Sequence, residues 1–398
     1  MNDKIQQHLS QIEKEIIHIR RHLHQHPEIS NHEVETSKLI QHKLAGFGIP
    51  FETGFAKTGV LGIIQGDKPG KTVALRADMD ALPIQELNDH AYTSIHDNAM
   101  HACGHDAHTA MLLGAGYILS KMKEYIHGTV LLVFQPAEEN SPIGGAKVML
   151  DDGVFDTYKP DVIYGQHVWP NLPVGTMGIR DTKMMGATDR FKLVIRGKGG
   201  HASMPHQTSD SVVTAGHMIT SLQTVVSRNV DPLEASVLTI AKIEGGSTHN
   251  VITDCVILEG SIRSYSSDVK KTLKERFHTI VDHTASMFEA DVEIDYLDGY
   301  PATINTPEWA ALARTSAQKV LGEDATPEVE PSLAGEDFSR FLQKYPGAFI
   351  WLGTQIENKE EQKALHNPRF QLNEDALPNG SAFFVQLALD TLEKLGEE

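Results

Sequence analysis

Hydrophobic and polar positions alternate in two different styles along the chain. From the N-terminus to about residue 180, short apolar runs alternate with segments in which apolar residues recur every three or four positions. The runs predict strands and the periodic segments predict helices. The predicted strands cover 60–64, 72–76, 129–134 and 162–168, and the predicted helices cover 3–25, 33–47 and 106–125. This alternation is typical of an α/β domain whose mainly parallel sheet is covered on both faces.

The pattern changes after about residue 184. Six elements follow in the order strand, helix, strand, strand, helix, strand, at 191–197, 209–228, 236–243, 255–263, 268–289 and 291–296. This is the order of a ferredoxin-like α+β domain. The first style resumes after residue 306, where 349–353 predict another buried strand. We therefore expect one domain built from residues 1–184 and 299–398, interrupted by a second domain at 185–298.

Composition and charge narrow the possible partners. A chain of 398 residues is long enough for two domains. Its net charge of −18 disfavours nucleic acid and anionic membranes, because both attract an excess of Lys and Arg. Two cysteines suit a reducing cytosol, the N-terminal segment lacks the apolar core of a signal peptide, and the apolar runs are too short to span a bilayer. We expect a cytoplasmic protein that binds neither nucleic acid nor membranes.

The segment from His101 to His108 is the most informative stretch of the chain. It places Cys103 two positions before His105, among further histidines and a carboxylate. Thiolate and imidazole are the side chains that hold late first-row metals. A scarce cysteine among histidines is better explained by metal ligation than by a disulfide. Other ligands must then come from elsewhere in the chain.

The adjacent pair Glu138 and Glu139 follows the predicted strand 129–134. Ligands of open α/β sheets bind beyond the carboxyl ends of the strands. Consecutive side chains of an extended backbone point in different directions, so one carboxylate can bind a metal ion while its neighbour faces the water that the metal activates. That neighbour can take a proton from the water and pass it to a leaving amine. The alternative is a solvated acidic loop.

Several other polar residues have an ordinary explanation when taken alone. His167 could be a packed core residue, and His366 could be a loop histidine. Asp80 could orient a metal-bound imidazole, while Asp78 could equally cap a turn. The four histidines near the end of the first helix predict a solvated helix end: His18, His22, His24 and His26.

Together these motifs resemble a known family. They comprise residues 21–28, 76–83, 101–108, 135–139, 199–203, 335–338 and 365–368. In this order they resemble the metal-dependent amidohydrolases and metallopeptidases related to hippurate hydrolase, aminoacylase and the plant auxin-conjugate hydrolases. The resemblance extends over nearly the whole chain and implies a dinuclear-metal aminopeptidase-like catalytic domain with an inserted ferredoxin-like lid and dimerisation domain.

The resemblance also implies the site residues of the catalytic domain. Two divalent metal ions per subunit would be held by five ligands: Cys103, His105, Glu139, His167 and His366. Cys103 would occupy the bridging position that many relatives give to Asp, and Glu138 would act as general base and acid. Ligands that mix sulfur, nitrogen and oxygen admit Zn, Mn, Co or Ni.

The inserted domain would supply three further residues. The resemblance implies that His201 reaches across a dimer to stabilise the oxyanion of the tetrahedral intermediate. Asn250 and Arg263 match residues associated with the substrate carboxylate, and Arg pairs with carboxylates in bidentate fashion. Thr253 stands where many relatives have Pro or Ala. The chain would therefore form a homodimer or a higher homo-oligomer.

The function that follows is hydrolysis of the amide bond of N-acyl-L-amino acids, such as N-acetyl or hippurate-like compounds, to a carboxylic acid and a free amino acid. The alternative is a dipeptidase or aminopeptidase with the same metal chemistry. Such an enzyme would prefer a substrate with a free α-amino group. The sequence does not identify the acyl group or the amino acid.

Overall fold

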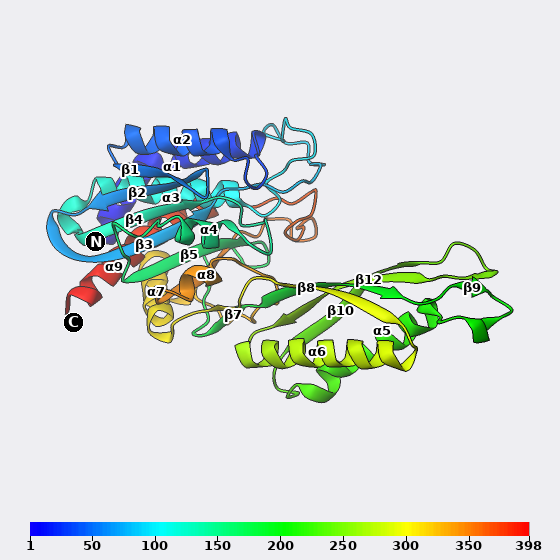
Figure 1. Cartoon of the computed structure of the whole chain (residues 1–398). Coiled ribbons are helices and arrows are strands. Elements are labelled where there is room, and N and C mark those ends of the chain that lie inside the picture. The colour runs from blue at the N-terminus through cyan, green and yellow to red at the C-terminus, as the bar shows by residue number, and fades with distance from the viewer. Residues whose placement is uncertain (398) are drawn as a thin grey trace. The chain divides into compact units, whose positions relative to one another are not determined.

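The computed structural model describes residues 1–397, which form two compact units (Figure 1). Unit 1 comprises residues 1–184, 304–330 and the chain from 337 onward, and unit 2 comprises residues 185–303 and 331–336. The short segment 331–336 belongs to unit 2 by its contacts. Gly186 N donates to Ala334 O at 3.0 Å, and Arg263 Nη1 donates to Leu333 O at 3.2 Å.

The sheet of unit 1 has seven strands in the order β1-β2-β4-β3-β5-β15-β6. Its centre, β4-β3-β5-β15, is parallel, whereas β1, β2 and β6 are joined by antiparallel pairs. The expected α/β fold with a mainly parallel sheet is confirmed. The strands are β1 Phe51–Phe55, β2 Gly59–Gln65, β3 Lys68–Asp78, β4 His127–Gln135, β5 Val162–Trp169, β6 Met177–Gly178 and β15 Gly347–Gly353. Two short strands, β7 (Lys183–Met185) and β14 (Thr303–Ile304), lie where the chain passes between the units.

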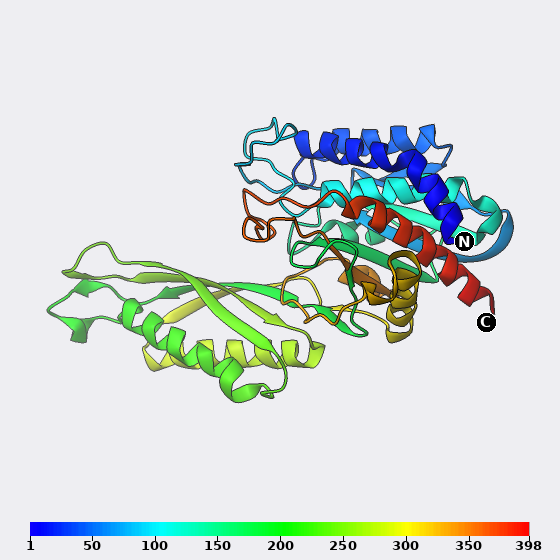
Figure 2. The ribbon, with the colours of Figure 1, turned by 180° about the vertical axis from the view of Figure 1, so that it is seen from behind.

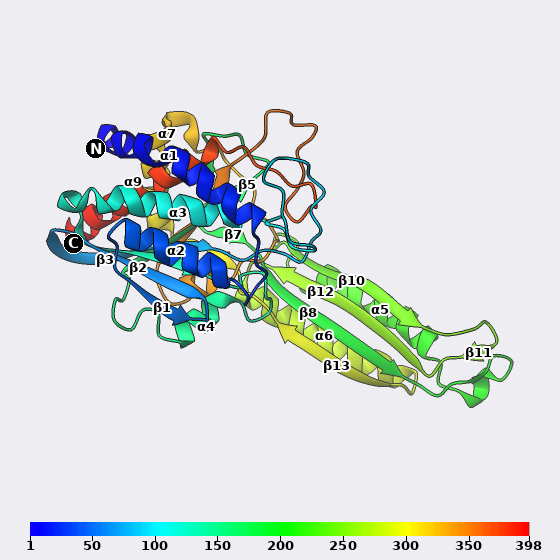
Figure 3. The same cartoon turned by 90° about the horizontal axis from the view of Figure 1, so that it is seen from above.

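Helices cover this sheet, because packing on it removes the apolar face of each helix from water. The helix α1 buries Ile5, Ile12, Ile16 and Ile19, and it packs on α3 and α9, which in turn pack on β3 (Figure 3). On β4 lies α4, which also contacts α8. The helices are α1 Asn2–Gln25, α2 Val34–Gly46, α3 His105–Ser120, α4 Gly145–Asp151, α7 Pro307–Leu321, α8 Ser339–Leu342 and α9 Ala376–Glu397, with 3₁₀ turns η1 Lys123–Tyr125 and η3 Glu323–Ala325.

Unit 2 has a four-stranded antiparallel sheet in the order β10-β12-β8-β13. Both of its long helices, α5 and α6, lie on the same face of this sheet (Figure 2). The chain order of the six elements is the ferredoxin-like order that the sequence predicts. Their bounds are β8 Ala187–Arg196, α5 Ser211–Asn229, β10 Ser236–Gly245, β12 Cys255–Ser264, α6 Ser267–Met287 and β13 Asp291–Asp298. Beyond the sheet, β9 (Gly200–His201) pairs with β11 (Val251–Ile252), and η2 spans Pro205–Gln207.

Two further findings complete the fold. The strand β1 was not predicted, because Phe51–Phe55 contains only two apolar side chains and is only partly buried. Among residues 1–397, none of the helices combines the length and the apolar character that crossing a membrane requires.

Candidate metal centre

The parallel strands bring the polar segments to one edge of the sheet of unit 1. The strand β3 ends at Asp78, and β4 ends at Gln135, just before Glu138. His167 lies inside β5, two residues before the end of that strand at Trp169. The carboxyl ends of neighbouring parallel strands meet at a common edge, which is the usual place for a ligand site in an α/β fold.

A glycine with left-handed backbone geometry brings the start of α3 to the same edge. Gly104 has φ 86° and is the residue before the helix, which begins at His105. A Cβ atom on Gly104 would lie 2.4 Å from Cγ2 of Val168, so any side chain there would collide with β5. Gly104 therefore lets the chain turn between Cys103 and His105 and pass close to β5.

All five residues proposed as metal ligands converge at this edge. Cys103, His105 and His167 offer ligand atoms within 4.8 Å of one another, and so do Cys103, Glu139 and His366. The Cys103 Sγ atom lies 3.4 Å from His167 Nε2 and 3.3 Å from His366 Nε2. The Glu139 Oε1 atom lies 3.1 Å from His366 Nε2. Among residues 1–397 no group makes a hydrogen bond to this oxygen. One sulfur atom thus belongs to both groups, as a bridging ligand would.

The rings of His105 and His167 are held through their Nδ1 atoms. His105 Nδ1 lies 3.1 Å from Asp80 Oδ1, and His167 Nδ1 lies 2.7 Å from the carbonyl oxygen of Val168. Both rings therefore carry a proton on Nδ1. The Nε2 atom of His167 lies near the sulfur of Cys103, and that of His105 lies 3.7 Å from Asp78 Oδ2. The buried Nε2 of His105 has no hydrogen-bond partner within the described chain. A buried ring nitrogen without a partner is costly unless an ion satisfies it.

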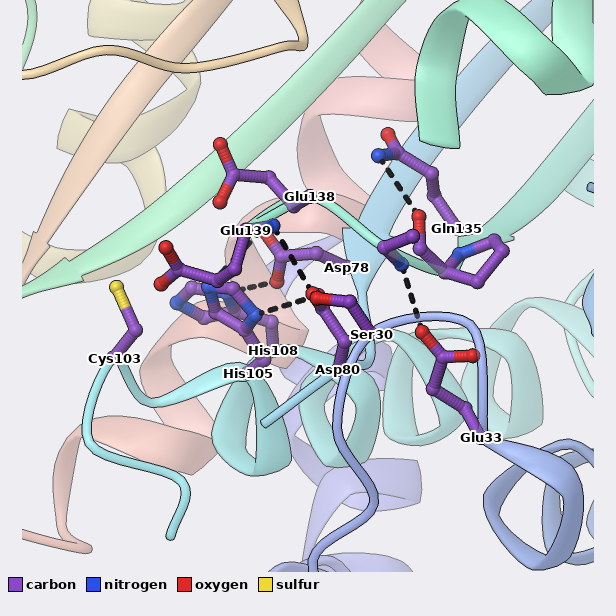
Figure 4. Close-up of polar contacts among 12 residues, drawn as sticks. Ser30, Glu33, Asp78, Asp80, Cys103, His105, His108, Gln135, Glu138 and Glu139 are labelled. Carbon is purple, nitrogen blue, oxygen red and sulfur yellow. Dashed lines mark hydrogen bonds and ion pairs between the residues drawn. The ribbon is translucent and has the colours of Figure 1, made fainter. Parts of the chain in front are cut away.

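The carboxylate of Asp80 connects these groups to the turn that carries the glutamates. Its Oδ2 atom accepts hydrogen bonds from the Ser30 hydroxyl at 2.6 Å and from the backbone N–H of Glu139 at 3.0 Å (Figure 4). Its Oδ1 atom faces His105. The predicted role of Asp80 in orienting an imidazole is consistent with this geometry.

The local charges favour cations. Burial raises the pKa of the Cys103 thiol well above its ordinary value, and the carboxylates of Glu139, Glu138 and Asp78 raise it further. Burial opposes a charge on His105, but Asp78, Asp80 and Glu139 raise the pKa of its imidazole to about 10. An excess of buried negative charge is stabilised by a divalent ion, and the mixture of sulfur, nitrogen and oxygen donors suits late first-row metals. The residues present therefore fit a metal pair.

The side chain of Glu138 is buried, and one of its carboxylate oxygens lies within 4.8 Å of ligand atoms of His105 and Glu139 (Figure 4). Its Oε1 atom accepts a hydrogen bond from the backbone N–H of Asp337 at 3.3 Å. The expectation of extended backbone at this pair was wrong. Both glutamates lie in a turn that follows Ala137, which has φ 55°. The turn, and not strand alternation, sets the directions of the two side chains.

A buried ionic network beneath the site was not predicted. Arg76 Nη1 lies 2.6 Å from Asp78 Oδ2, and Arg76 Nη2 lies 3.0 Å from Asp337 Oδ1. Asp78 Oδ1 lies 2.5 Å from Nδ1 of His108, whose Nε2 accepts the backbone N–H of Val168 at 2.9 Å. Asp78 therefore pairs with the Arg76 guanidinium and accepts the Nδ1–H of a neutral His108, and it is not a turn cap. Only the position of Arg76 and Asp78 at the end of an apolar strand could have suggested this role.

The histidine cluster of the first helix needs one correction. His24 is fully buried, not solvated. Its Nδ1 lies 2.8 Å from Asp106 Oδ2, and its Nε2 lies 3.1 Å from Glu86 Oε1. Arg20 Nε also lies 2.9 Å from Asp106 Oδ2, so His24 and Arg20 tie α1 to the start of α3. The apolar stripe of the helix gave no sign of these partners, which are far away in the sequence.

Two of the three predicted residues of unit 2 lie side by side. His201 Nδ1 accepts hydrogen bonds from the backbone N–H of Ser203 at 3.1 Å and from its hydroxyl at 2.8 Å. A neutral His201 must then carry its proton on Nε2. The carbonyl oxygen of Asn250 accepts the N–H of Ala202 at 3.1 Å, so Asn250, the residue before β11, lies beside His201 of β9.

Arg263 lies at the other end of unit 2. It is paired with Thr188 near the start of β8, whereas Cys255 is paired with Arg196 at the end of β8. A strand rises about 3.3 Å per residue, which leaves roughly 26 Å of β12 between Cys255 and Arg263. Asn250 precedes Cys255 in the chain. Within one chain, the structure does not bring Arg263 near Asn250.

Comparisons with known proteins place the chain among metal-dependent hydrolases. A profile of Peptidase family M20/M25/M40 matches residues 74–390. An N-acetyl-L-cysteine deacetylase of Bacillus subtilis is 41% identical, covering 97% of this chain and 90% of the relative. Thermostable carboxypeptidase 2 of Saccharolobus solfataricus is 40% identical, covering 97% of this chain and 98% of the relative.

Solved structures agree with the sequence comparisons. A dinuclear metal binding peptidase from the M20 family of Bacillus subtilis has a TM-score of 0.84 at 34% identity. The similarity covers 96% of this chain and 99% of that one. The resemblance seen in the motifs is confirmed, and the chain belongs to peptidase family M20/M25/M40.

Proposed function

We propose that this protein hydrolyses the amide bond of N-acyl-L-amino acids to a carboxylic acid and a free amino acid. The observation that carries the proposal is the convergence of five ligand-type side chains around the sulfur of Cys103, with the Glu138 carboxylate beside them. The similarity of the chain to an N-acetyl-L-cysteine deacetylase supports N-acyl amino acids as the class of substrate.

The proposed cofactor is a pair of divalent ions of Zn, Mn, Co or Ni. Cys103 would be shared, His105 and His167 would complete one group of ligands, and Glu139 and His366 the other. Bound there, divalent ions supply Lewis acidity that polarises an acyl carbonyl and makes water a nucleophile near neutral pH.

Glu138 is proposed to move the proton. As the oxygen of water bonds to the acyl carbon, one proton of the water passes to the Glu138 carboxylate. The same proton then passes to the amide nitrogen as the C–N bond breaks, so the amine leaves in neutral form. The Asp337 N–H, 3.3 Å from Glu138 Oε1, limits the rotation of this carboxyl group.

Residues of unit 2 are proposed to bind the substrate. His201 would donate its Nε2 proton to the oxyanion, and the hydrogen bonds from Ser203 to Nδ1 favour the tautomer that this role needs. Arg263 and Asn250 would bind the carboxylate of the substrate. Because Asn250 and Arg263 lie at opposite ends of unit 2 in one chain, we infer that a second copy supplies His201 and Asn250, and that the protein is a homodimer. Unit 2 would then be the lid and dimerisation domain.

The composition supports a cytoplasmic enzyme whose partner is a small molecule and not a nucleic acid. A second candidate activity is cleavage of peptides, since a carboxypeptidase is among the relatives. Both kinds of substrate present a carboxylate next to the scissile amide. A dipeptidase or aminopeptidase would in addition require a free α-amino group.

A panel of substrates separates these activities. The protein, reconstituted with each metal in turn, is assayed on acetyl- and benzoyl-amino acids, on dipeptides, and on acyl amino acids whose carboxylate is capped as an amide. The proposal expects hydrolysis of the acyl amino acids and loss of activity after capping. Hydrolysis of the dipeptides alone would refute the proposal in favour of the peptidase.

A further inference from the structure

The turn that carries both glutamates begins at a residue with strained backbone geometry. Ala137 has φ 55° and is buried. A residue with a Cβ atom is strained in this left-handed region, and it stays there only when the surrounding structure holds it. Whatever holds Ala137 therefore also fixes the directions of the side chains of Glu138 and Glu139.

A buried carboxylate from a distant part of the chain makes that contact. Glu33 lies just before α2, and its Oε1 atom accepts the backbone N–H of Ala137 at 2.9 Å (Figure 4). The same oxygen accepts the N–H of Asn31, also at 2.9 Å, and Asn31 has φ 69°. The Oε2 atom accepts the hydroxyl of Thr58 at 3.0 Å. One fully buried side chain thus ties together two backbone positions that are both in the left-handed region.

The same segment holds the turn at a second point. Three residues before Glu33, the hydroxyl of Ser30 donates to Asp80 Oδ2, and that oxygen also accepts the N–H of Glu139. The turn is therefore held at Ala137 directly and at Glu139 through Asp80.

We propose that Glu33 is a positioning residue that fixes the turn bearing Glu138 and Glu139, acting through the amide of Ala137. This inference rests on the proposed function in one respect, because it assumes that turnover depends on where the carboxylate of Glu138 lies. Placement matters at such a site, since a displacement of about 1 Å can lower a rate by about 100-fold.

The contacts of Glu33 predict which replacements preserve the turn. Glu33→Gln keeps an oxygen for the N–H groups of Ala137 and Asn31, and its new amide group can donate to the hydroxyl oxygen of Thr58. Glu33→Met retains a similar volume but leaves both N–H groups buried without an acceptor. The Gln variant should therefore behave like the native protein, and the Met variant should not.

Glu28 provides a matched control. Its carboxylate accepts the backbone N–H groups of Glu35 and Thr36 at 3.1 and 2.8 Å, so it also anchors α2, but it does not touch the turn. Glu28→Met should weaken α2 without moving Ala137. A general loss of stability can thereby be separated from loss of the turn.

The test measures turnover and hydrogen exchange in the whole chain. At saturating metal, Glu33→Met should lower kcat about 10- to 100-fold with KM changed less than about twofold, whereas Glu33→Gln and Glu28→Met should stay within about threefold of native kcat. In metal-free protein, amides in 136–145 should exchange faster in Glu33→Met only. Should that variant not fold, Thr58→Val, which removes one of the three contacts, should show the faster exchange to a smaller degree.

Native exchange in 136–145 for Glu33→Met, or an equal change in Glu28→Met, would overturn the inference. So would a Gln variant as impaired as the Met variant. The variant Glu138→Gln distinguishes failure of the proposed function from failure of the positioning role of Glu33. If that variant retains turnover, the proposed function fails, whereas if it is inactive while Glu33→Met is fully active, only the positioning role fails.

Discussion

Mixing two inactive chains should restore activity, because the proposed site needs residues from two copies. One chain carries His201→Ala and the other Glu138→Gln. Roughly 26 Å of β12 separates Arg263 from the end of the strand near Asn250, a far greater distance than that between the carboxylate and the carbonyl of one amino acid. If Arg263 binds the substrate carboxylate, His201 must therefore come from the other copy.

The size of the recovery follows from counting sites. In a mixed dimer, one site has an intact Glu138 and receives His201 from the partner, while the other site lacks both. Equal amounts of the two chains give half mixed dimers, so about a quarter of all sites should work. Each variant alone should retain about 1% or less, since removal of an oxyanion donor costs about 10²–10³ in rate.

The assay is hydrolysis of an N-acetyl amino acid at saturating metal, after the chains have been mixed under conditions that exchange subunits. A control chain carries both substitutions and is mixed equally with native chain. Only native dimers then keep working sites, so about a quarter of all sites should remain active, whereas a His201 acting within its own chain would leave about half. An exchanged mixture of the two single variants that is no more active than its parents would refute the argument.

Four further outcomes follow from the structure. Glu138→Gln should keep its bound metal, measured by elemental analysis, and lose about 10²–10⁴-fold in kcat; native turnover in a metal-loaded variant would exclude its role. Cys103→Ala should bind fewer than two metal ions per chain, and Cys103→Asp should bind two, because the sulfur belongs to both donor groups. Full metal content in the Ala variant would show that the sulfur is not a ligand. Asp337→Asn should lower the free energy of unfolding by about 3 kcal/mol in denaturant titrations. Both carboxylate oxygens of Asp337 accept hydrogen bonds from buried donors, and the NH₂ group of Asn would face two of these donors without an acceptor. An unchanged midpoint of unfolding would contradict this. Burial, aided by Asp80, raises the pKa of Glu33 to about 7 from 4.5, so its contribution to stability is complete below pH 4.5 and is lost as pH rises through 7. Glu33→Gln should therefore remove about 3 kcal/mol of pH dependence between pH 5 and 8, and an unchanged stability profile would contradict the shifted pKa.

The sequence predicted those parts of the site whose chemistry is concentrated in short segments. Cys103 and His105 stand in one motif, and the glutamate pair follows a clear apolar strand. Period and composition also predicted the parallel sheet and the order of elements in the inserted unit. His167 and His366 were identified only through the resemblance, because a single histidine in an apolar or loop segment carries no local signal.

The residues that support the site could not be predicted, because their roles depend on contacts between distant segments. Glu33 meets a backbone amide 104 positions away, and His24 meets Asp106 82 positions away. Asp337 lies 261 positions from Arg76. The sequence shows that these residues are polar, but only the fold shows that they are buried and which groups they contact. The left-handed geometry of Ala137 is similarly invisible, because alanine gives no sign of it.

The buried sulfur of Cys103 makes capture of the ions a proton-releasing event. With its pKa raised well above the ordinary value, this thiol carries its proton at neutral pH, and so does the His105 imidazole. An incoming ion has to displace both protons before it gains its ligands. Release of two protons makes the apparent affinity rise about 100-fold for each unit of pH. Acidification of the surrounding solution should therefore weaken metal binding by these residues.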